Sequence, residues 1–182
     1  MRNFVEELIA EYYLTIGCIV TTNFWTPFKS VRKRSRKGFN EIYEAQSWTD
    51  IDVLAKNESE LFIIQIKSSI RCKLDAIKIK EFFNRIDSYL KKGIAPDGIS
   101  NIKWWLKHSK LRKIVVHEDK YSPRSYLKIL SNEGIEVKYF GDYFFDIIKY
   151  IKKKKGTKEN HSLMRFLHFL IKNNLIKNIN DI

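Results

Sequence analysis

Two apolar runs separated by a short polar break are the clearest pattern in this chain. Residues 51–55 read Ile-Asp-Val-Leu-Ala and residues 61–66 read Leu-Phe-Ile-Ile-Gln-Ile, with the polar segment Lys-Asn-Glu-Ser-Glu between them. Short runs rich in β-branched and aromatic residues on both sides of a polar turn predict a β-hairpin. With the turn near Asn57 and Glu58, symmetric pairing places Asp52 opposite Ile64 or Gln65.

The open end of this hairpin gathers polar side chains. Side chains alternate along a strand, so Gln65 and Lys67 share one face while Ile64 and Ile66 occupy the other. A strand this apolar is expected to be buried on both faces. A lysine in such a strand needs an anionic partner or a functional reason, and the pairing brings Asp52 to the same place.

Helices and strands alternate along the rest of the chain. Apolar residues at helical spacing over 4–14, with Asn3 as a cap and Gly17 as a stop, predict a first helix, and a strand follows from Cys18. Beyond the hairpin, the pattern predicts a helix over 74–90, a loop over 94–100, a short basic helix over 103–110, a strand over 113–117, a helix over 123–132, a strand over 135–140 and a helix around 143–148. This βαβ rhythm favours parallel strands added to a mixed sheet, so the predicted fold class is α/β, with helices flanking the sheet.

The C-terminal segment carries one more helix. After Gly156, apolar residues over 162–173 form a strong stripe, which is expected either to cap the core or to dock on a second copy of the chain as a homodimer. With 182 residues and 44% hydrophobic content, the chain is long enough for one domain with a solid core. We therefore expect an α/β domain over 1–155 and a C-terminal helical extension over 156–182.

The residues at the open end of the hairpin suit phosphodiester hydrolysis with a divalent metal. Asp52 is a hard oxygen ligand for Mg²⁺, which keeps several waters and takes one or two carboxylates from a protein. Gln65 can supply an amide oxygen, and the main chain of Ile66 a carbonyl oxygen. Lys67 would then balance charge on the scissile phosphate or orient the attacking water, while the metal generates the nucleophile. An ordinary hairpin with polar residues at its strand ends is the alternative.

These residues together resemble the PD-(D/E)XK nuclease superfamily. Asp52 followed by an apolar triplet matches its aspartate, Gln65-Ile66-Lys67 its third motif, and Glu6, eleven residues before Gly17, its helix acid, with Glu7 as the alternative register. The resemblance, to archaeal Holliday junction resolvases and Mrr-type enzymes, covers the first half of the chain well. It implies a restriction-endonuclease-like core and cleavage of double-stranded or branched DNA with Mg²⁺ or Mn²⁺. Ile51 stands where many members have proline. Gln65 replaces the usual acid, which implies weaker metal affinity.

Charge agrees with a nucleic-acid partner. The formal net charge is +13 and the isoelectric point is near 9.6, so the surface should attract a polyanion with salt-dependent affinity. Part of the lysine excess fits the drift expected of an AT-rich genome, which does not favour arginine. A basic cluster is expected in a loop between the first two strands, near the mouth of the site, where it would hold phosphates; its residues are Lys29, Arg32, Lys33, Arg34, Arg36 and Lys37. The run 152–155 is expected to be a solvated helix end.

The remaining residue types narrow the function classes. Cys18 and Cys72 lack any paired motif and are expected to be buried thiols in a reducing compartment, which excludes a four-cysteine iron–sulfur nuclease. His117 and His161 have no second ligand at metal-binding spacing and are expected to be structural. The sequence has no glycine-rich phosphate-binding loop, which argues against an NTPase. No signal peptide or membrane span is evident, so a cytoplasmic location is expected.

Three functional hypotheses follow from the sequence. The first is a metal-dependent DNA endonuclease or junction resolvase that uses Glu6, Asp52, Gln65 and Lys67. The second is a nuclease-derived module that keeps the fold and the basic surface but lacks turnover. The third is an RNA-binding protein without such a site, which expects Asp52 and Lys67 to lie far apart.

Overall fold

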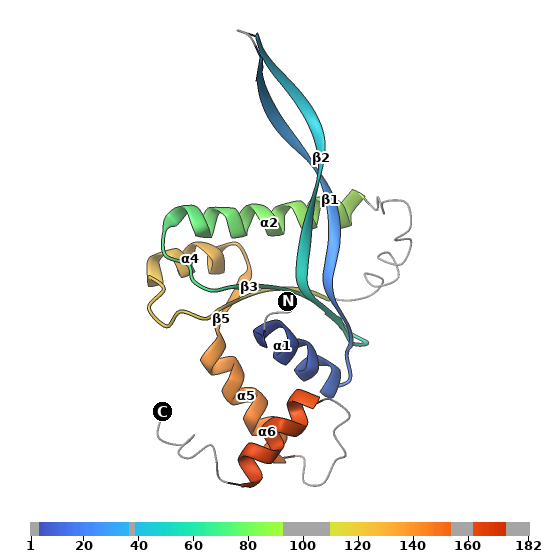
Figure 1. Cartoon of the computed structure of the whole chain (residues 1–182), viewed down its shortest axis with the longest axis vertical. Helices are drawn as coiled ribbons and strands as arrows, with labels where there is room; N and C mark the ends of the chain where they lie inside the picture. The colour runs from blue at the N-terminus through green and yellow to red at the C-terminus, as the bar shows by residue number, and fades with distance from the viewer. Residues whose placement is uncertain (1–3, 37–38, 93–109, 154–161, 174–182) are drawn as a thin grey trace.

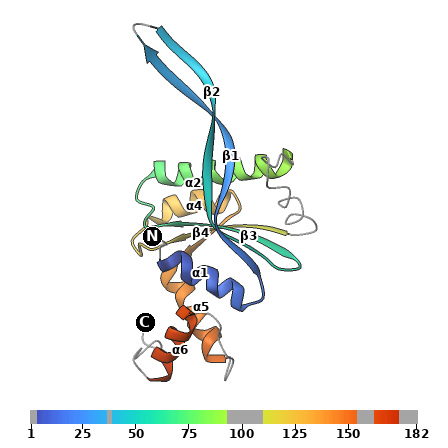
Figure 2. The same cartoon turned by 45° about the vertical axis from the view of Figure 1, so that its right-hand side comes forward.

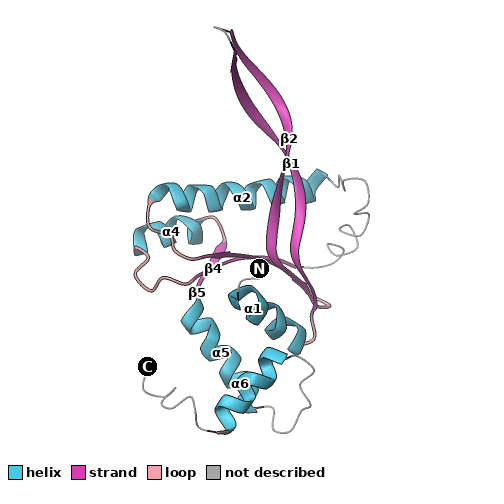
Figure 3. Ribbon diagram, viewed as in Figure 1, coloured by secondary structure: helices cyan, strands magenta, loops and turns pink. Residues whose placement is uncertain are grey.

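The structure is a computed structural model that describes residues 4–36, 39–92, 110–153 and 162–173. In this part of the chain a mixed five-stranded sheet is flanked by helices on both faces (Figure 1 and Figure 3), which confirms the predicted α/β class. In chain order the elements are α1 (Phe4–Thr15), β1 (Ile19–Arg36), β2 (Phe39–Lys56), β3 (Glu60–Lys67), α2 (Lys73–Lys92), β4 (Lys110–His117), α4 (Arg124–Asn132), β5 (Ile135–Tyr139), α5 (Phe140–Lys153) and α6 (Ser162–Lys172).

The sheet has the order β1-β2-β3-β4-β5 and changes character in the middle. β1, β2 and β3 pair antiparallel, whereas β3, β4 and β5 pair parallel. The parallel strands are joined by α2 and α4, because a parallel connection needs a crossover. The predicted hairpin is β2–β3, and its turn is held by Asn57, whose side-chain oxygen accepts the N–H of Ser59 at 2.9 Å and of Glu60 at 2.7 Å.

The sheet is buried on both faces. On one face Ile64 and Val116 belong to an apolar cluster with α1, α5 and α6. On the other face Ile63 and Val115 belong to a second cluster with α2 and α4. These four side chains are at most 1% exposed, as predicted from the nearly continuous apolar run of β3. Burying both faces fixes the register of the strands, since a shift by one residue would exchange the two clusters.

The predicted end of the first helix at Gly17 is confirmed. Gly17 has a φ of 91°, a conformation that glycine adopts without steric cost. Its N–H donates to the carbonyl oxygen of Leu14 at 3.1 Å, and the N–H of Cys18 donates to that of Tyr13 at 2.9 Å. This pair of bonds is the Schellman arrangement that ends a helix. It turns the chain directly into β1 and so fixes α1 against the sheet.

The basic segment predicted as a loop is a strand, and that prediction is wrong. β1 and β2 pair in continuous register from Phe24–Ile51 to Arg36–Phe39, so residues 29–36 lie within β1. The physical reason is that residues 39–48 provide a partner strand, and a ladder of hydrogen bonds satisfies the backbone groups of both strands. The outer part of the β1/β2 hairpin extends beyond α2 and the rest of the molecule (Figure 1 and Figure 2).

The structure also bears on the predictions for the C-terminal helix and for the two cysteines. α6 packs on α1 and α5, and its Leu167 is buried in the core, as the capping alternative expects. Cys18 is buried as predicted, but Cys72 is exposed. The prediction for Cys72 was wrong because this residue lies in the turn before α2, where its N–H donates to the Asp75 side chain at 3.1 Å. In the described part of the chain, no helix is long and apolar enough to cross a membrane.

Several predictions fall on residues outside the described ranges. They include the loop over 94–100, all but the last residue of the basic helix over 103–110, His161 and the end of the 152–155 run. Lys110, the last residue of the predicted basic helix, is instead the first residue of β4. Lys152 and Lys153 do lie in the last turn of α5, as predicted. His117 makes a local contact, with Nδ1 at 2.9 Å from the carbonyl oxygen of Asp119.

Candidate active site

The candidate site lies where β2 and β3 separate. Their ladder runs from Lys56–Leu61 to Val53–Ile64 and ends there. At the next position the side chain of Asp52 takes over the role of the neighbouring backbone, because its Oδ2 accepts the Ile66 N–H at 2.5 Å. The same oxygen accepts Nε2 of Gln65 at 2.6 Å. Asp52 and Gln65 are thus paired as the sequence predicted, and Asp52 is 7% exposed.

The backbone of β2 is irregular at Asp52. Ile51 belongs to the cluster under α2 and Val53 to the cluster under α1, although residues two apart in a regular strand share a face. The pairs Thr22–Val53 and Phe24–Ile51 place Asn23 of β1 opposite Asp52. Asn23 has a φ of 52°, a region that non-glycine residues rarely adopt. The distortion on both strands leaves the Asp52 carboxylate between the two faces of the sheet.

Burial and neighbouring charges set the ionisation of Asp52. Burial raises the pKa of Asp52 to about 6, against the opposing effects of the Ile66 N–H and the Lys67 ammonium. Two other acids, Asp50 and Glu6, raise the pKa further. A carboxyl group whose pKa is shifted toward neutral pH by its surroundings is a common feature of functional sites.

Of the two acids in the first turn of α1, Glu6 is the less exposed one. Glu6 is half-buried and acts on the pKa of Asp52, whereas Glu7 is exposed on the outer side of α1. α1 packs its buried residues Val5, Leu8 and Ile9 toward the sheet, so Glu6 approaches the gap at Asp52 from the α1 face. Gln65 and Lys67 belong to the α2 face. The site is therefore reached by side chains from both sides of the sheet.

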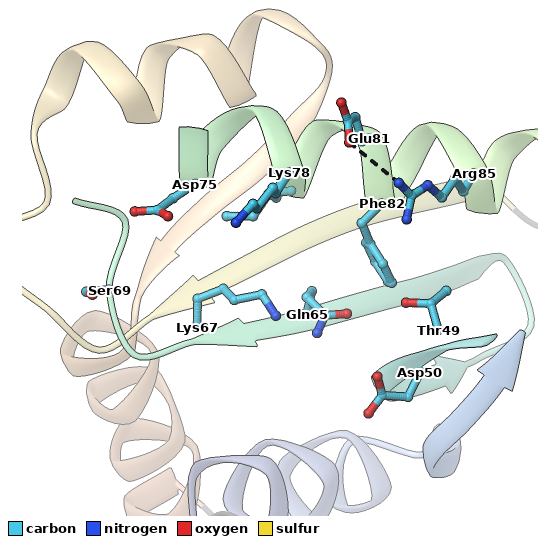
Figure 4. A pocket seen from close by; sticks show the side chains of 11 residues that line it. Thr49, Asp50, Gln65, Lys67, Ser69, Asp75, Lys78, Glu81, Phe82 and Arg85 are labelled. Atoms are coloured by element: carbon cyan, nitrogen blue, oxygen red, sulfur yellow. Dashed lines mark ion pairs between the residues drawn. The ribbon is translucent and has the colours of Figure 1, made fainter. Parts of the chain in front are cut away.

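A pocket of about 370 Å³ opens beside Gln65 and Lys67 on the α2 side. In Figure 4 the Lys67 ammonium points along β3 toward Gln65, and Lys78, Phe82 and Arg85 reach the pocket from α2. Arg85 is paired with Glu81 at 3.5 Å. The pocket is lined by Thr49, Asp50, Gln65, Lys67, Ser69, Asp75, Lys78, Ile79, Glu81, Phe82 and Arg85. The lining of the pocket therefore carries both cations and acids.

The oxygen atoms around Asp52 fit a hard divalent cation. Oε1 of Gln65 is buried and has no hydrogen-bond partner among the described residues. The N–H and C=O of a strand residue point the same way, so the Ile66 carbonyl faces the gap into which its N–H donates. Within the described ranges no three His, Cys, Asp or Glu side chains form a metal-binding group. A site here would instead combine Asp52 with an amide oxygen, a carbonyl and water, a set that suits Mg²⁺.

The structure brings some predicted site residues together and separates others. Gln65 and the Ile66 N–H donate to the Asp52 carboxylate, and the charges of Lys67 and Glu6 act on its pKa.

The basic cluster is not at the mouth, which corrects the earlier expectation. Arg32 and Arg34 are seven and nine residues along β1 from Trp25, the partner of Asp50. At ~3.3 Å per residue, these two arginines therefore lie about 23 and 30 Å from Trp25. The cause is the strand conformation of this segment, which carries the cluster outward. Lys37 lies outside the described residues.

The pocket residues that sequence reasoning missed include Asp50, Lys78 and Arg85. Asp50 was visible as an acid two residues before Asp52, a spacing that signals proximity along a strand. Lys78 and Arg85 lie seven residues apart on α2, about two helical turns, and so share one face. That spacing signals a common surface, but the sequence does not show which element this surface faces.

Comparisons with known proteins leave the family open. No protein-family model matches this chain, and no curated protein matches it. Among solved structures, the chain is similar to one described as "Crystal Structure of Protein of Unknown Function AF1548", at 14% identity and a TM-score of 0.44. The similarity covers 75% of this chain and 56% of that one, so the chain spans about half the length of this neighbour.

Proposed function

We propose that this protein is a Mg²⁺-dependent DNA nuclease of the PD-(D/E)XK kind. The observation that carries the proposal is the convergence on the gap between β2 and β3. There a buried carboxylate, an amide oxygen without a partner in the described part of the chain and a strand carbonyl lie together with a lysine, and the charge of an acid of α1 acts on the carboxylate. These are the groups that the sequence resemblance expects at one place, and they come from α1, β2 and β3 in the expected order.

Each residue of the site has a distinct task in this proposal. Asp52 and the oxygens of Gln65 and Ile66 would hold the cation, with Glu6 binding through water. When bound, the cation lowers the pKa of a water molecule and polarises a phosphate oxygen. Lys67 holds a positive charge beside Asp52 and the pocket, where it stabilises the negative charge that develops on the phosphate. Burial excludes bulk water and so strengthens these interactions.

The other hypotheses are weighed on the same residues. An RNA-binding protein without a site expects Asp52 and Lys67 far apart, but the Lys67 charge acts directly on the pKa of Asp52. An inactive binding module is favoured by one feature, the neutral Gln65 in place of an acid. As part of our proposal the protein acts in the cytoplasm, where an exposed thiol such as Cys72 stays reduced.

The test is cleavage of supercoiled, linear and four-way-junction DNA in Mg²⁺ or EDTA. We expect wild type to cleave at least one substrate in Mg²⁺, and Lys67→Ala to lose activity by about 100-fold or more, the usual scale for removing one electrostatic group. The control is Lys80→Ala, which removes a lysine of α2 that is paired with Glu133 outside the pocket. The proposal fails if wild type and Lys67→Ala behave identically on every substrate.

A further inference from the structure

The proposed nuclease site does not account for the outer part of the β1/β2 hairpin. From Trp25–Asp50 to Arg36–Phe39, twelve consecutive residue pairs join the two strands. At ~3.3 Å per residue this segment, here called the arm, is about 40 Å long. Figure 1 and Figure 2 show it extending away from the sheet and helices as a twisted two-stranded ribbon. Such a ribbon is marginally stable in water unless something covers it.

The arm combines positive charge with exposed apolar side chains. Residues 29–36 of β1 include five Lys and Arg, whereas residues 39–48 of β2 include two Glu. Arg32 and Arg34 are exposed, and Arg32 is paired in register with Tyr43, which is 39% exposed. Its neighbour Ile42 is 64% exposed. The ligand that covers this surface should therefore be a polyanion that also offers apolar contacts.

We infer that the arm binds double-stranded DNA by lying in its major groove. The major groove is about 12 Å wide and admits a two-stranded β-ribbon, and its floor offers base edges and thymine methyl groups to side chains such as Tyr43 and Ile42. One turn of B-DNA spans about 34–36 Å, close to the length of the arm. Arginines along the ribbon reach the phosphates on either side.

Two features of the structure favour duplex DNA over a second copy of the chain. Two identical arms carry the same excess of positive charge, so they repel each other at close range. In addition, the arm starts at the candidate site, because Trp25 at its base pairs with Asp50, which lines the pocket. Trp25 is 54% exposed. A duplex held along the arm would thus be led to the pocket, and the inference rests on the proposed function for this last step.

The test compares two charge-matched double variants without Mg²⁺. R32Q/R34Q removes two positive charges from the arm, and K152Q/K153Q removes two exposed charges from the end of α5. If each arginine neutralises one phosphate, R32Q/R34Q should weaken binding of a 20-base-pair duplex by about 30-fold at 0.15 M salt. The slope of log affinity against log salt should then fall by about 2. The control variant should change both quantities much less, and a 20-nucleotide single strand should bind more weakly than the duplex.

Footprinting and a small substrate separate this inference from the proposed function. Wild type should protect guanine N7, in the major groove, from dimethyl sulfate, and R32Q/R34Q should lose that protection. Equal affinity of both double variants, no N7 protection, or arm-dependent dimers in sedimentation would overturn the inference. Mg²⁺-dependent hydrolysis of bis(p-nitrophenyl) phosphate, which is too small to reach the arm, should be unchanged in R32Q/R34Q. Its loss in Lys67→Ala would then report on the site alone.

Discussion

Asp52→Asn should stabilise the metal-free protein at neutral and alkaline pH. This result would be unusual, because most substitutions of buried residues destabilise a fold. The reason is that Asp52 is 7% exposed and its burial raises its pKa to about 6. Above that pH the fold must hold a buried carboxylate whose charge Lys67 offsets incompletely. Asparagine has nearly the same shape, and its oxygen can still accept the Ile66 N–H.

The magnitude follows from the linkage between ionisation and folding. A pKa near 6 in the folded state, against about 3.9 in the unfolded chain, corresponds to about 3 kcal/mol of lost stability once the carboxylate is ionised. Because the folded pKa is the higher one, this contribution is favourable below pH ~4 and is lost as the pH rises to ~6. Some of the gain in the variant is offset by weaker hydrogen bonds, so we expect 1–3 kcal/mol, or about 3–10 °C in Tm.

Thermal unfolding followed by circular dichroism, in EDTA and at several pH values from 4 to 8, measures this effect. The difference in Tm between Asp52→Asn and wild type should be near zero at pH 4 and complete by pH 7. Glu58→Gln is the control, since it neutralises an exposed acid in the β2–β3 turn. Mg²⁺ at pH 8 should then raise the Tm of wild type and leave that of the variant unchanged.

Two results would refute this reasoning. If Asp52→Asn is less stable than wild type at pH 8, the Asp52 carboxylate is better compensated than its surroundings indicate. If the difference in Tm is the same at pH 4 and pH 8, the ionisation of Asp52 is not what changes stability.

Three further predictions concern the site, the sheet and the thiols. Gln65→Glu adds a carboxylate beside Asp52, so it should lower the Tm in EDTA at pH 8 and shift the Mg²⁺ midpoint in a Tm titration to lower concentration; an unchanged midpoint would argue against Gln65 as a ligand. Arg112→Met breaks a two-bond contact with Glu136, at 2.6 and 2.5 Å, and should cost about 1–2 kcal/mol in urea unfolding, whereas no loss would show that this pair contributes nothing. A thiol reagent should label Cys72 at once and Cys18 only on unfolding, because Cys18 is buried and its pKa is raised; two fast thiols would contradict this.

The spacing of apolar residues in the sequence was sufficient to predict most of the elements that form the core. β3 is a continuous apolar run between turn residues, and each flanking helix presents a stripe toward the sheet, so burial and local pattern indicate the same element. The sequence also narrowed the partner of Asp52 to Ile64 or Gln65, because a short hairpin with one turn allows few registers, and the structure selects Gln65. The choice of Glu6 over Glu7 needed the packing of α1, since both acids stand in its first turn.

The arm was not predictable in the same way. No apolar alternation marks residues 29–36 as a strand in the sequence, and clustered charges are typical of solvated loops. Their conformation depends on a partner strand that begins beyond them in the chain. The pocket residues of α2 posed a related difficulty. Lys78 and Arg85 lie on a helix whose orientation over β3 is fixed by apolar side chains on another part of its surface.

Several energetically unfavourable features lie around Asp52, and none of them stabilises the fold. The carboxylate has a raised pKa, Oε1 of Gln65 is buried without a partner among the described residues, and Asn23 opposite has a positive φ. An uncompensated buried acceptor costs about 1–3 kcal/mol and a residue in a rare backbone region costs a similar amount. Added to the cost of the charge, these are a large fraction of the 5–15 kcal/mol that stabilises a typical domain.

A bound divalent cation would relieve two of these costs together. It would neutralise the Asp52 carboxylate and supply a partner for the Gln65 oxygen, so the same atoms that destabilise the metal-free fold would become ligands. A purely structural origin predicts the opposite, namely that small substitutions at these positions improve stability with no loss of any activity. Gln65→Leu distinguishes the two explanations, since it removes the buried oxygen, together with the Nε2 donor to Asp52, without adding charge. In our proposal it loses both the Mg²⁺-dependent rise in Tm and DNA cleavage, and retention of cleavage would favour the structural origin.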